Sequence, residues 1–160
     1  MSDNERYDLA LGYATRMHDG QYRIGGDEYI THPVAVAEIV RKQGYGIDYQ
    51  IAALFHDLLE DTDATEHDLM VNGANAEIVE AVRLLTKHKD CVMRDYVSKI
   101  KRNDMAFVVK CADRLHNLRS ANCTSDEFKR QYVSETEKWY IDFSDEIKEA
   151  VNSLSRMIKC

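Results

Sequence analysis

The segment HDLLEDT, residues 56–62, places a histidine and several acidic residues directly after an apolar stretch. On a helix, Glu60 lies four residues after His56 and three after Asp57, so these side chains share one face. Asp61 in turn lies four residues after Asp57. Buried carboxylates are costly unless they are paired or bind a metal ion, and a divalent cation beside the helix would account for this cluster. The alternative is a capped helix end with a solvated acidic tail.

Two further segments offer side chains of the same kind. His32 lies in YITHP, at the predicted start of a helix that follows a glycine-rich loop. Asp113 lies in KCADRLHNLRSA, inside an otherwise apolar helix. Taken alone, His32 is typical of a capping or surface residue, and Asp113 of an ion pair with Arg114 or Arg119. The ordered set of His, His-Asp and Asp is more specific than any of its members.

Helices must position these side chains, because the chain has one proline and seven glycines among its 160 residues. No alternating strand pattern competes with the helical spacing of apolar residues. The sequence therefore predicts an all-α, compact single-domain helical bundle over residues 1–160, with about seven or eight helices. The expected helices are 5–18, Pro33 to Gly44, a third capped by Asp48 and running to 61, 66–72 with Thr65 and Asp68 as capping pair, 75–87, 91–102, 104–121, and a long final segment capped by Ser125 or Asp126.

Composition excludes several classes of protein. Hydrophobic residues make up 44% and charged residues 31%, which is typical of a globular chain. No apolar run approaches the ~20 residues that cross a bilayer, and the polar start MSDNERYDLA does not resemble a secretory signal, so we expect a cytoplasmic protein. The scattered cysteines form no C-x-x-C pair, which argues against a thiolate zinc site. A net charge of −7 disfavours nonspecific nucleic-acid binding but leaves room for a small phosphorylated ligand.

In its ordered His, His-Asp and Asp motifs, the chain resembles the HD superfamily of metal-dependent phosphohydrolases. More narrowly, it is similar to the hydrolase domain of the RelA/SpoT alarmone enzymes and to the stand-alone small alarmone hydrolases. The resemblance covers nearly the whole chain, and no synthetase domain is implied. It implies hydrolysis of ppGpp or pppGpp to GDP or GTP plus pyrophosphate. The segments that carry it are HDGQYRIGGDEYITHPVAVAEIV, AALFHDLLEDT, LTK at 85–87, VVKCADRLHNLRSA and SETEKWY.

The resemblance also implies roles for individual residues. The family's metal ligands fall on His32, His56, Asp57 and Asp113, and its catalytic acidic pair falls on Glu60 and Asp61. The substrate-binding residues fall on Arg23 in the loop, Asn117 facing the ribose or phosphates, Ser120 at the position of a small hydroxyl residue, and Tyr140 in the C-terminal helix.

Basic side chains are the expected partners of the substrate's remaining phosphates. For two of them an ordinary ion pair is the alternative, and for Lys87 the alternative is a charge at a helix C-terminus. We expect His18 to close the first helix and His116 to bond to a neighbouring helix without being a ligand. The basic candidates are Arg23, Lys87, Lys110 and Arg114, with the ion-pair alternative for the last two.

A ligand set of imidazoles and carboxylates suits Mn²⁺, the usual metal of the family, although Zn²⁺, Ni²⁺ or Co²⁺ would compete for it. Such an ion lowers the pKa of bound water and withdraws charge from phosphorus. Glu60 and Asp61 would serve as acid and base, in an order that the sequence does not fix.

Two departures from the family pattern keep other functions open. Ile24 stands where the family often has Lys, Ser or Thr, and Glu28-Tyr29 replaces Pro-Tyr. The second hypothesis is therefore an HD enzyme for another nucleotide or a phosphorylated dinucleotide such as NADPH. The third is a non-catalytic nucleotide sensor, against which the intact Glu60 and Asp61 argue. The sequence makes no prediction of the oligomeric state.

Overall fold

The computed structural model describes residues 1–159, and its regular structure is helical apart from one isolated antiparallel bridge between Tyr22 and Glu28. The predicted all-α fold is confirmed. The helices are α1 (Asp3–Met17), α2 (Thr31–Lys42), α3 (Ile47–Phe55), α4 (Leu58–Asp61), α5 (Glu66–Val71), α6 (Ala76–Leu85), α7 (Met93–Lys101), α8 (Asp104–Ser120), the 3-10 turn η1 (Ala121–Cys123), α9 (Asp126–Trp139) and α10 (Asp145–Arg156).

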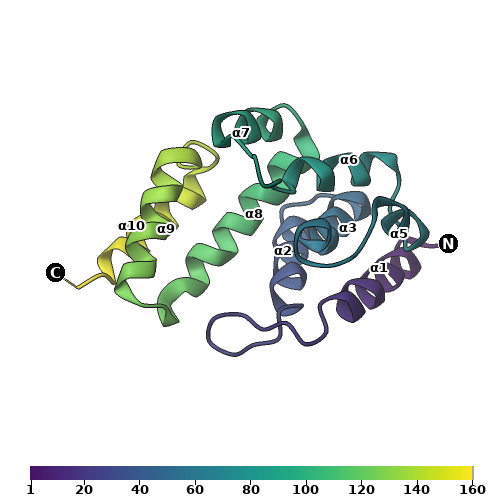
Figure 1. Ribbon diagram of the computed structural model, residues 1–160, viewed down its shortest axis with the longest axis horizontal. Coiled ribbons are helices and arrows are strands. Elements are labelled where there is room, and N and C mark those ends of the chain that lie inside the picture. The colour runs from purple at the N-terminus through teal and green to yellow at the C-terminus, as the bar shows by residue number, and fades with distance from the viewer. Residues whose placement is uncertain (160) are drawn as a thin grey trace.

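Helix α8 crosses the middle of the molecule and separates two groups of helices (Figure 1). On one side it contacts α2, α3 and α6, and on the other it contacts α10, with α7 packed against it as well. Helix α3 is the most deeply buried, because residues 51–55 are fully inaccessible to solvent. A helix buried all round has no solvent-facing polar stripe, which is why this segment reads as an apolar run.

Several predicted helix boundaries are confirmed by their capping contacts. Thr65 and Asp68 form a reciprocal capping box at the start of α5, and the Ser125 hydroxyl accepts a hydrogen bond from Phe128 N–H at the start of α9. Pro33 lies in the first turn of α2. Gly44, with φ of +93°, follows the end of α2 in the left-handed region that favours glycine.

Two predicted helices are wrong in their extent. Asp48 does not cap the third helix, since α3 begins after Gly46 and Asp48 instead forms an ion pair with Arg6. The predicted helix to residue 61 is interrupted after α3. The long final segment is two helices, because the chain turns at Phe143, which is buried, and Ser144 caps α10.

The loop between α1 and α2 passes beside the C-terminal half of α8 (Figure 1). Arg23 in this loop donates a hydrogen bond to Asn117 of α8, and Cys123 Sγ lies 3.8 Å from the Ile24 carbonyl oxygen. The loop therefore brings residues 22–24 next to α8 and η1. Over residues 1–159, no helix has the length and apolar character needed to cross a membrane.

Candidate metal centre and adjoining cavity

The chain changes direction between α3 and α4, at His56 and Asp57. Both residues have backbone angles near the helical region, but His56 N–H reaches only to the Ala53 carbonyl, three residues back. His56 Nδ1 also bonds to that carbonyl oxygen, at 2.6 Å. This break lets the two consecutive side chains meet, with His56 Nε2 3.1 Å from Asp57 Oδ2.

The four predicted metal ligands come together from α2, the α3–α4 junction and α8. His32 Nε2 lies 2.8 Å from Asp113 Oδ1 and 3.9 Å from Asp57 Oδ2. His56 Nε2 lies 3.3 Å from Asp113 Oδ1. One ligand atom from each of His32, His56 and Asp113 lies within 4.8 Å of the others, and Asp57 approaches from the side of His56. Three segments far apart in the sequence thus form one buried cluster.

The state of His56 tests whether a cation fits this cluster. Its Nδ1 faces a carbonyl oxygen and therefore carries the hydrogen, which leaves the lone pair of a neutral ring on Nε2. That Nε2 is buried beside two carboxylate oxygens, and neither contact has the geometry of a hydrogen bond. A lone pair facing carboxylates is unfavourable unless a proton or a metal ion lies between them. The residues therefore fit a metal ion.

Electrostatics give the same result. Burial disfavours a charged His56, but the carboxylates of Asp57 and Asp113 outweigh burial and raise the pKa of His56 well above its usual 6.5. Burial favours a neutral Asp113, but the charge of Lys110, the hydrogen bond with His32 and the nearby His56 hold the pKa of Asp113 well below 3.8. The cluster thus attracts positive charge, and a metal ion would compete with the protons that it otherwise holds.

Each ligand candidate has a partner behind it. The Tyr29 hydroxyl donates to Asp57 Oδ2 at 2.5 Å, and His32 Nδ1 lies 2.8 Å from His116 Nδ1. The two carboxylate oxygens of Asp113 have different partners. Oδ1 faces the histidines, and Oδ2 accepts a hydrogen bond from Lys110 Nζ at 3.2 Å. Such outer contacts fix the orientation of metal ligands.

Lys110 and Arg114 both form ion pairs within the protein, which was the alternative to binding the phosphates of a substrate. The buried Lys110 pairs with Asp113, and its Nζ lies over the ring of Tyr140 at 5.3 Å. Arg114 pairs with Glu135 at 2.6 Å, and its guanidinium lies 4.3 Å from the ring centre of Tyr140. Both cations are therefore engaged in the core.

The acidic pair, Glu60 and Asp61, forms the end of the short helix α4 at the edge of the cluster. Glu60 is exposed, and its Oε1 accepts a hydrogen bond of 2.6 Å from the Lys87 backbone N–H. The Asp61 carbonyl accepts from the Gln21 side chain at 3.0 Å. Desolvation first, and then the negative charges of Asp57 and Glu60, raise the pKa of Asp61 to about 6. In the metal-free cluster, Asp61 therefore keeps its proton to a higher pH than an ordinary aspartate does.

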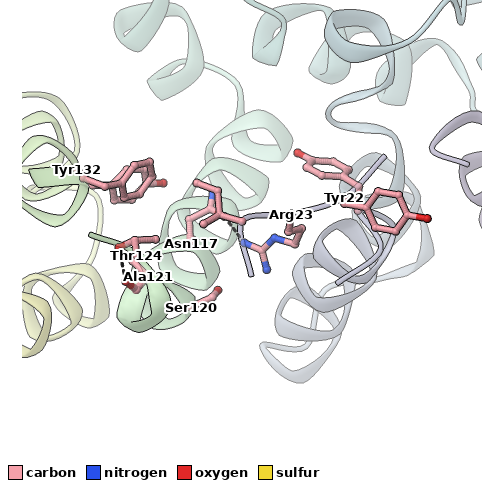
Figure 2. A pocket seen from close by; sticks show the side chains of 10 residues that line it. Tyr22, Arg23, Asn117, Ser120, Ala121, Thr124 and Tyr132 are labelled. Atoms are coloured by element: carbon pink, nitrogen blue, oxygen red, sulfur yellow. Dashed lines mark hydrogen bonds between the residues drawn. The ribbon is translucent and has the colours of Figure 1, made fainter. Parts of the chain in front are cut away.

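A cavity of about 270 Å³ adjoins the cluster between the α1–α2 loop, α8 and α9 (Figure 2). Arg23 Nη2 donates to Asn117 Oδ1 at 2.9 Å across its wall. Two residues connect the cavity to the cluster, because Tyr29 also donates to Asp57 and Asn117 also donates to Asp113 Oδ1 at 3.3 Å. The lining residues are Tyr22, Arg23, Ile24, Tyr29, Asn117, Ser120, Ala121, Thr124, Phe128 and Tyr132.

The sequence profile of the family described as "HD domain" matches residues 10–146, most of the chain. The chain belongs to the HD domain family. Its fold agrees with that of a solved structure described as a metazoan ortholog of SpoT that hydrolyzes ppGpp and plays a role in starvation responses. The TM-score is 0.79, with 23% identity and 94% of each chain covered. At that identity the likeness concerns the fold.

Curated relatives of this HD domain include two proteins from well-known bacteria. The guanosine-3′,5′-bis(diphosphate) 3′-pyrophosphohydrolase of Haemophilus influenzae is 37% identical over 133 residues, which are 77% of this chain and 20% of that protein. The bifunctional (p)ppGpp synthase/hydrolase SpoT of Escherichia coli is 36% identical over 133 residues, 77% of this chain and 19% of that protein. The chain thus spans about a fifth of the length of these relatives.

The sequence-predicted substrate residues of the HD domain are only partly brought together. Arg23, Asn117 and Ser120 line the cavity, whereas Lys87 lies beside Glu60 and does not. Tyr140 is fully buried and packs edge-on against Phe143. It lines none of this cavity, so its predicted contact with substrate has no support in the geometry.

The sequence predicted a bond from His116 to a neighbouring helix and an ion pair as the alternative for Lys110, but it did not identify their partners. The contact of Tyr29 with Asp57 was not predicted. Lys110 and His116 lie three residues before and after Asp113, one turn away on each side, and that spacing is the signal that identifies them. Tyr29 likewise lies three residues before His32. Phe128 and Tyr132 form a stacked aromatic pair on the far wall of the cavity, at helical spacing that also fits an ordinary core stripe.

Proposed function

We propose that this HD domain hydrolyses the 3′-pyrophosphate of guanosine alarmones, converting ppGpp or pppGpp to GDP or GTP plus pyrophosphate. The observation that carries the proposal is the His–Asp cluster joined through Tyr29 and Asn117 to a cavity that holds an arginine. Relatives at 36–37% identity are named for this reaction. The partner is thus a small guanosine nucleotide and not a nucleic acid.

In this proposal, one divalent ion is held by His32, His56, Asp57 and Asp113. Two imidazoles and two carboxylates without a thiolate suit Mn²⁺, and Zn²⁺, Ni²⁺ and Co²⁺ are its competitors. When bound, the ion supplies Lewis acidity, which lowers the pKa of water and withdraws charge from phosphorus.

The acidic pair carries the proton transfers. Water adds to the phosphorus next to the ribose 3′ oxygen, and the bond between them breaks. The 3′ oxygen leaves as a hydroxyl by taking up the proton that the acidic pair removed from the water. Asp61 takes the proton of the water, because its raised pKa suits proton exchange near neutral pH. Glu60 is fixed by the Lys87 backbone amide and orients the reacting groups.

The cavity binds the nucleoside end of the substrate. A guanidinium stacks on a purine and still donates hydrogen bonds, and Arg23 is already held by Asn117. Ser120 offers a hydroxyl on the same wall. The backbone N–H of Lys87 contacts Glu60, and its Nζ lies over the ring of Tyr96 at 5.5 Å. Lys87 is the proposed cation for the departing pyrophosphate.

A second candidate activity is the hydrolysis of a phosphorylated dinucleotide such as NADPH. Ile24 is exposed and lines the cavity together with the aromatic rings of Phe128 and Tyr132. Among the described residues of this lining, Arg23 is the one cation. An apolar, weakly charged cavity favours a flat ring over a second highly charged group.

The test is a product panel with the purified chain and Mn²⁺, over ppGpp, pppGpp, NADPH and deoxynucleoside triphosphates. We expect pyrophosphate from ppGpp and pppGpp and none from Asp57→Asn, which lacks one carboxylate ligand but keeps an oxygen for Tyr29. Asp63→Asn, an exposed neighbour outside the cluster, serves as the matched control. Orthophosphate from NADPH without turnover of ppGpp would establish the second candidate. Nucleotide binding without any product would establish a sensor.

A further inference from the structure

His32 and His116 form a pair of imidazole rings behind the proposed metal site. Their Nδ1 atoms lie 2.8 Å apart, and the rings are stacked at 26° with centres 5.1 Å apart. His32 is buried, whereas His116 is half-buried. At this distance one nitrogen must donate a hydrogen and the other must accept it, because two lone pairs would repel and two hydrogens would clash.

The position of the shared hydrogen depends on what His32 Nε2 binds. That nitrogen lies 2.8 Å from Asp113 Oδ1, inside the cluster. A metal ion takes the lone pair of Nε2, so the hydrogen of the neutral ring must then lie on Nδ1. His116 Nδ1 is the acceptor within reach. We propose that His116 is a positioning residue that holds His32 in the tautomer required for metal binding. The inference rests on the metal site of the proposed function.

The two ligand histidines differ in how this support is provided. His56 Nδ1 donates to the Ala53 backbone carbonyl, an acceptor that never donates. The Nδ1 atom of His116 can either donate or accept a hydrogen. Without metal, His32 Nε2–H donates to Asp113, and His116 Nδ1 then supplies the hydrogen to His32 Nδ1. With metal, the direction reverses. His116 therefore satisfies His32 in both states, and binding is accompanied by a coupled change of tautomer in the pair.

The supporting residue and a ligand share one rigid element. His116 follows Asp113 by three residues on α8, so one helix holds both the carboxylate and the acceptor for the opposing histidine. Movement of α2 against α8 would break the His32 contacts with Asp113 and with His116 together. The orientation of His32 is thereby fixed at both ring nitrogens.

The experiment measures Mn²⁺ affinity by isothermal titration of metal-free protein. We expect His116→Leu to weaken Mn²⁺ binding by roughly 10- to 100-fold, the usual effect of losing such an outer partner. His116→Asn places an amide at the position of Nδ1, able to donate or accept, and should retain near-normal affinity. His67→Leu removes an exposed histidine of α5 and should change nothing. Equal weakening in His116→Asn and His116→Leu, or unchanged affinity in a folded His116→Leu, overturns the proposal.

The position of the His32 hydrogen can also be measured directly by spectroscopy, independently of Mn²⁺ affinity and without a variant. In histidine-labelled wild-type protein, nitrogen NMR should show the His32 hydrogen on Nε2 without metal and on Nδ1 with Zn²⁺, a diamagnetic probe. A hydrogen that stays on Nε2 with Zn²⁺ overturns the proposal even where His116→Leu fails to fold. The variant Asp113→Ala distinguishes a failure of the proposed metal site from a failure of the proposed role of His116. If Asp113→Ala keeps its Mn²⁺, the metal site itself is wrong. If it loses Mn²⁺ while His116→Leu does not, only the role of His116 fails.

Discussion

Two aspartates of the site, four residues apart, titrate in opposite directions. Burial favours a neutral Asp57, but His56 outweighs burial and lowers the pKa of Asp57 to about 2. Burial also acts on Asp61, where the charges of Asp57 and Glu60 add to it and raise the pKa to about 6. The surroundings therefore hold Asp57 charged and let Asp61 take up a proton more readily, although both are aspartates.

The first prediction concerns turnover by the acidic pair. Asp61→Asn and Glu60→Gln should each lower kcat by ~10² or more, the usual size of a general acid–base contribution. Bound Mn²⁺ should be unchanged, because neither residue belongs to the proposed ligand set. Steady-state kinetics and metal analysis measure the two effects. Near-normal turnover in both variants would show that these acids are only the solvated end of a helix.

The second prediction concerns the stability of metal-free protein against pH. The folded-state pKa of Asp61, about 6, exceeds its usual 3.8, so its proton stabilises the fold fully below 3.8. That contribution is lost as the pH rises through about 6. The free energy of unfolding should therefore fall over this window relative to Asp61→Asn, as measured by urea unfolding. A constant difference between the two proteins contradicts the assignment.

The third prediction concerns Arg23, which forms one side of the cavity. Arg23→Ala should raise KM for ppGpp by roughly ten-fold, equivalent to about 1.4 kcal/mol of binding. The effect on kcat should be smaller, because Arg23 contacts the nucleoside in this proposal and not the scissile bond. Arg23→Lys should rescue little, since an ammonium cannot stack on a purine. An unaltered KM in Arg23→Ala would remove the loop from substrate binding.

At the scale of the elements, the sequence predicted the helices that local pattern determines. Helix α8 was expected at 104–121 and spans Asp104–Ser120, and the caps of α5 and α9 were identified by residue. Short-range hydrogen bonds from Ser, Thr and Asp decide these boundaries, so they can be read from neighbouring residues. The candidate ligands were found in the same way, from an ordered motif shared with a family.

The spacing of residues along the sequence could not predict contacts between distant elements. Tyr29 meets Asp57 across 28 residues of sequence, and His32 meets His116 across 84. Only the packing of the loop and α2 against the site brings these pairs together, and no local pattern encodes it.

The fourth prediction concerns the start of α8, the helix that carries Asp113. Asn103 caps it, because its side-chain oxygen accepts from Ala106 N–H at 2.9 Å. Asn103→Ala should reduce the free energy of unfolding by about 1 kcal/mol, whereas Asn103→Asp should retain the cap. Urea unfolding measures both. Mn²⁺ affinity should not change, since the cap lies almost three turns from Asp113. Equal midpoints for Asn103→Ala and wild type would contradict the capping role.

At the scale of the whole molecule, an acidic chain is proposed to bind a highly charged anion. The net charge is −7, and two cations near the site, Lys110 and Arg114, are already paired with Asp113 and Glu135. Long-range attraction therefore does not draw the nucleotide in. In the proposed function, the metal ion, Arg23 and Lys87 supply the local positive charge, so substrate binding should depend on the metal.

The last prediction is that the metal also stabilises the fold. Its proposed ligands come from α2, the α3–α4 junction and α8, and His32 and Asp113 are 81 residues apart. An ion that binds only the folded chain stabilises it by about 2.7 kcal/mol at a hundred-fold excess over Kd. For a chain of this size, that corresponds to a rise in Tm of roughly 5–10 °C. Differential scanning calorimetry with Mn²⁺ and with a chelator measures it. Asp57→Asn should show little of this rise, and an equal rise in that variant would place the ion elsewhere.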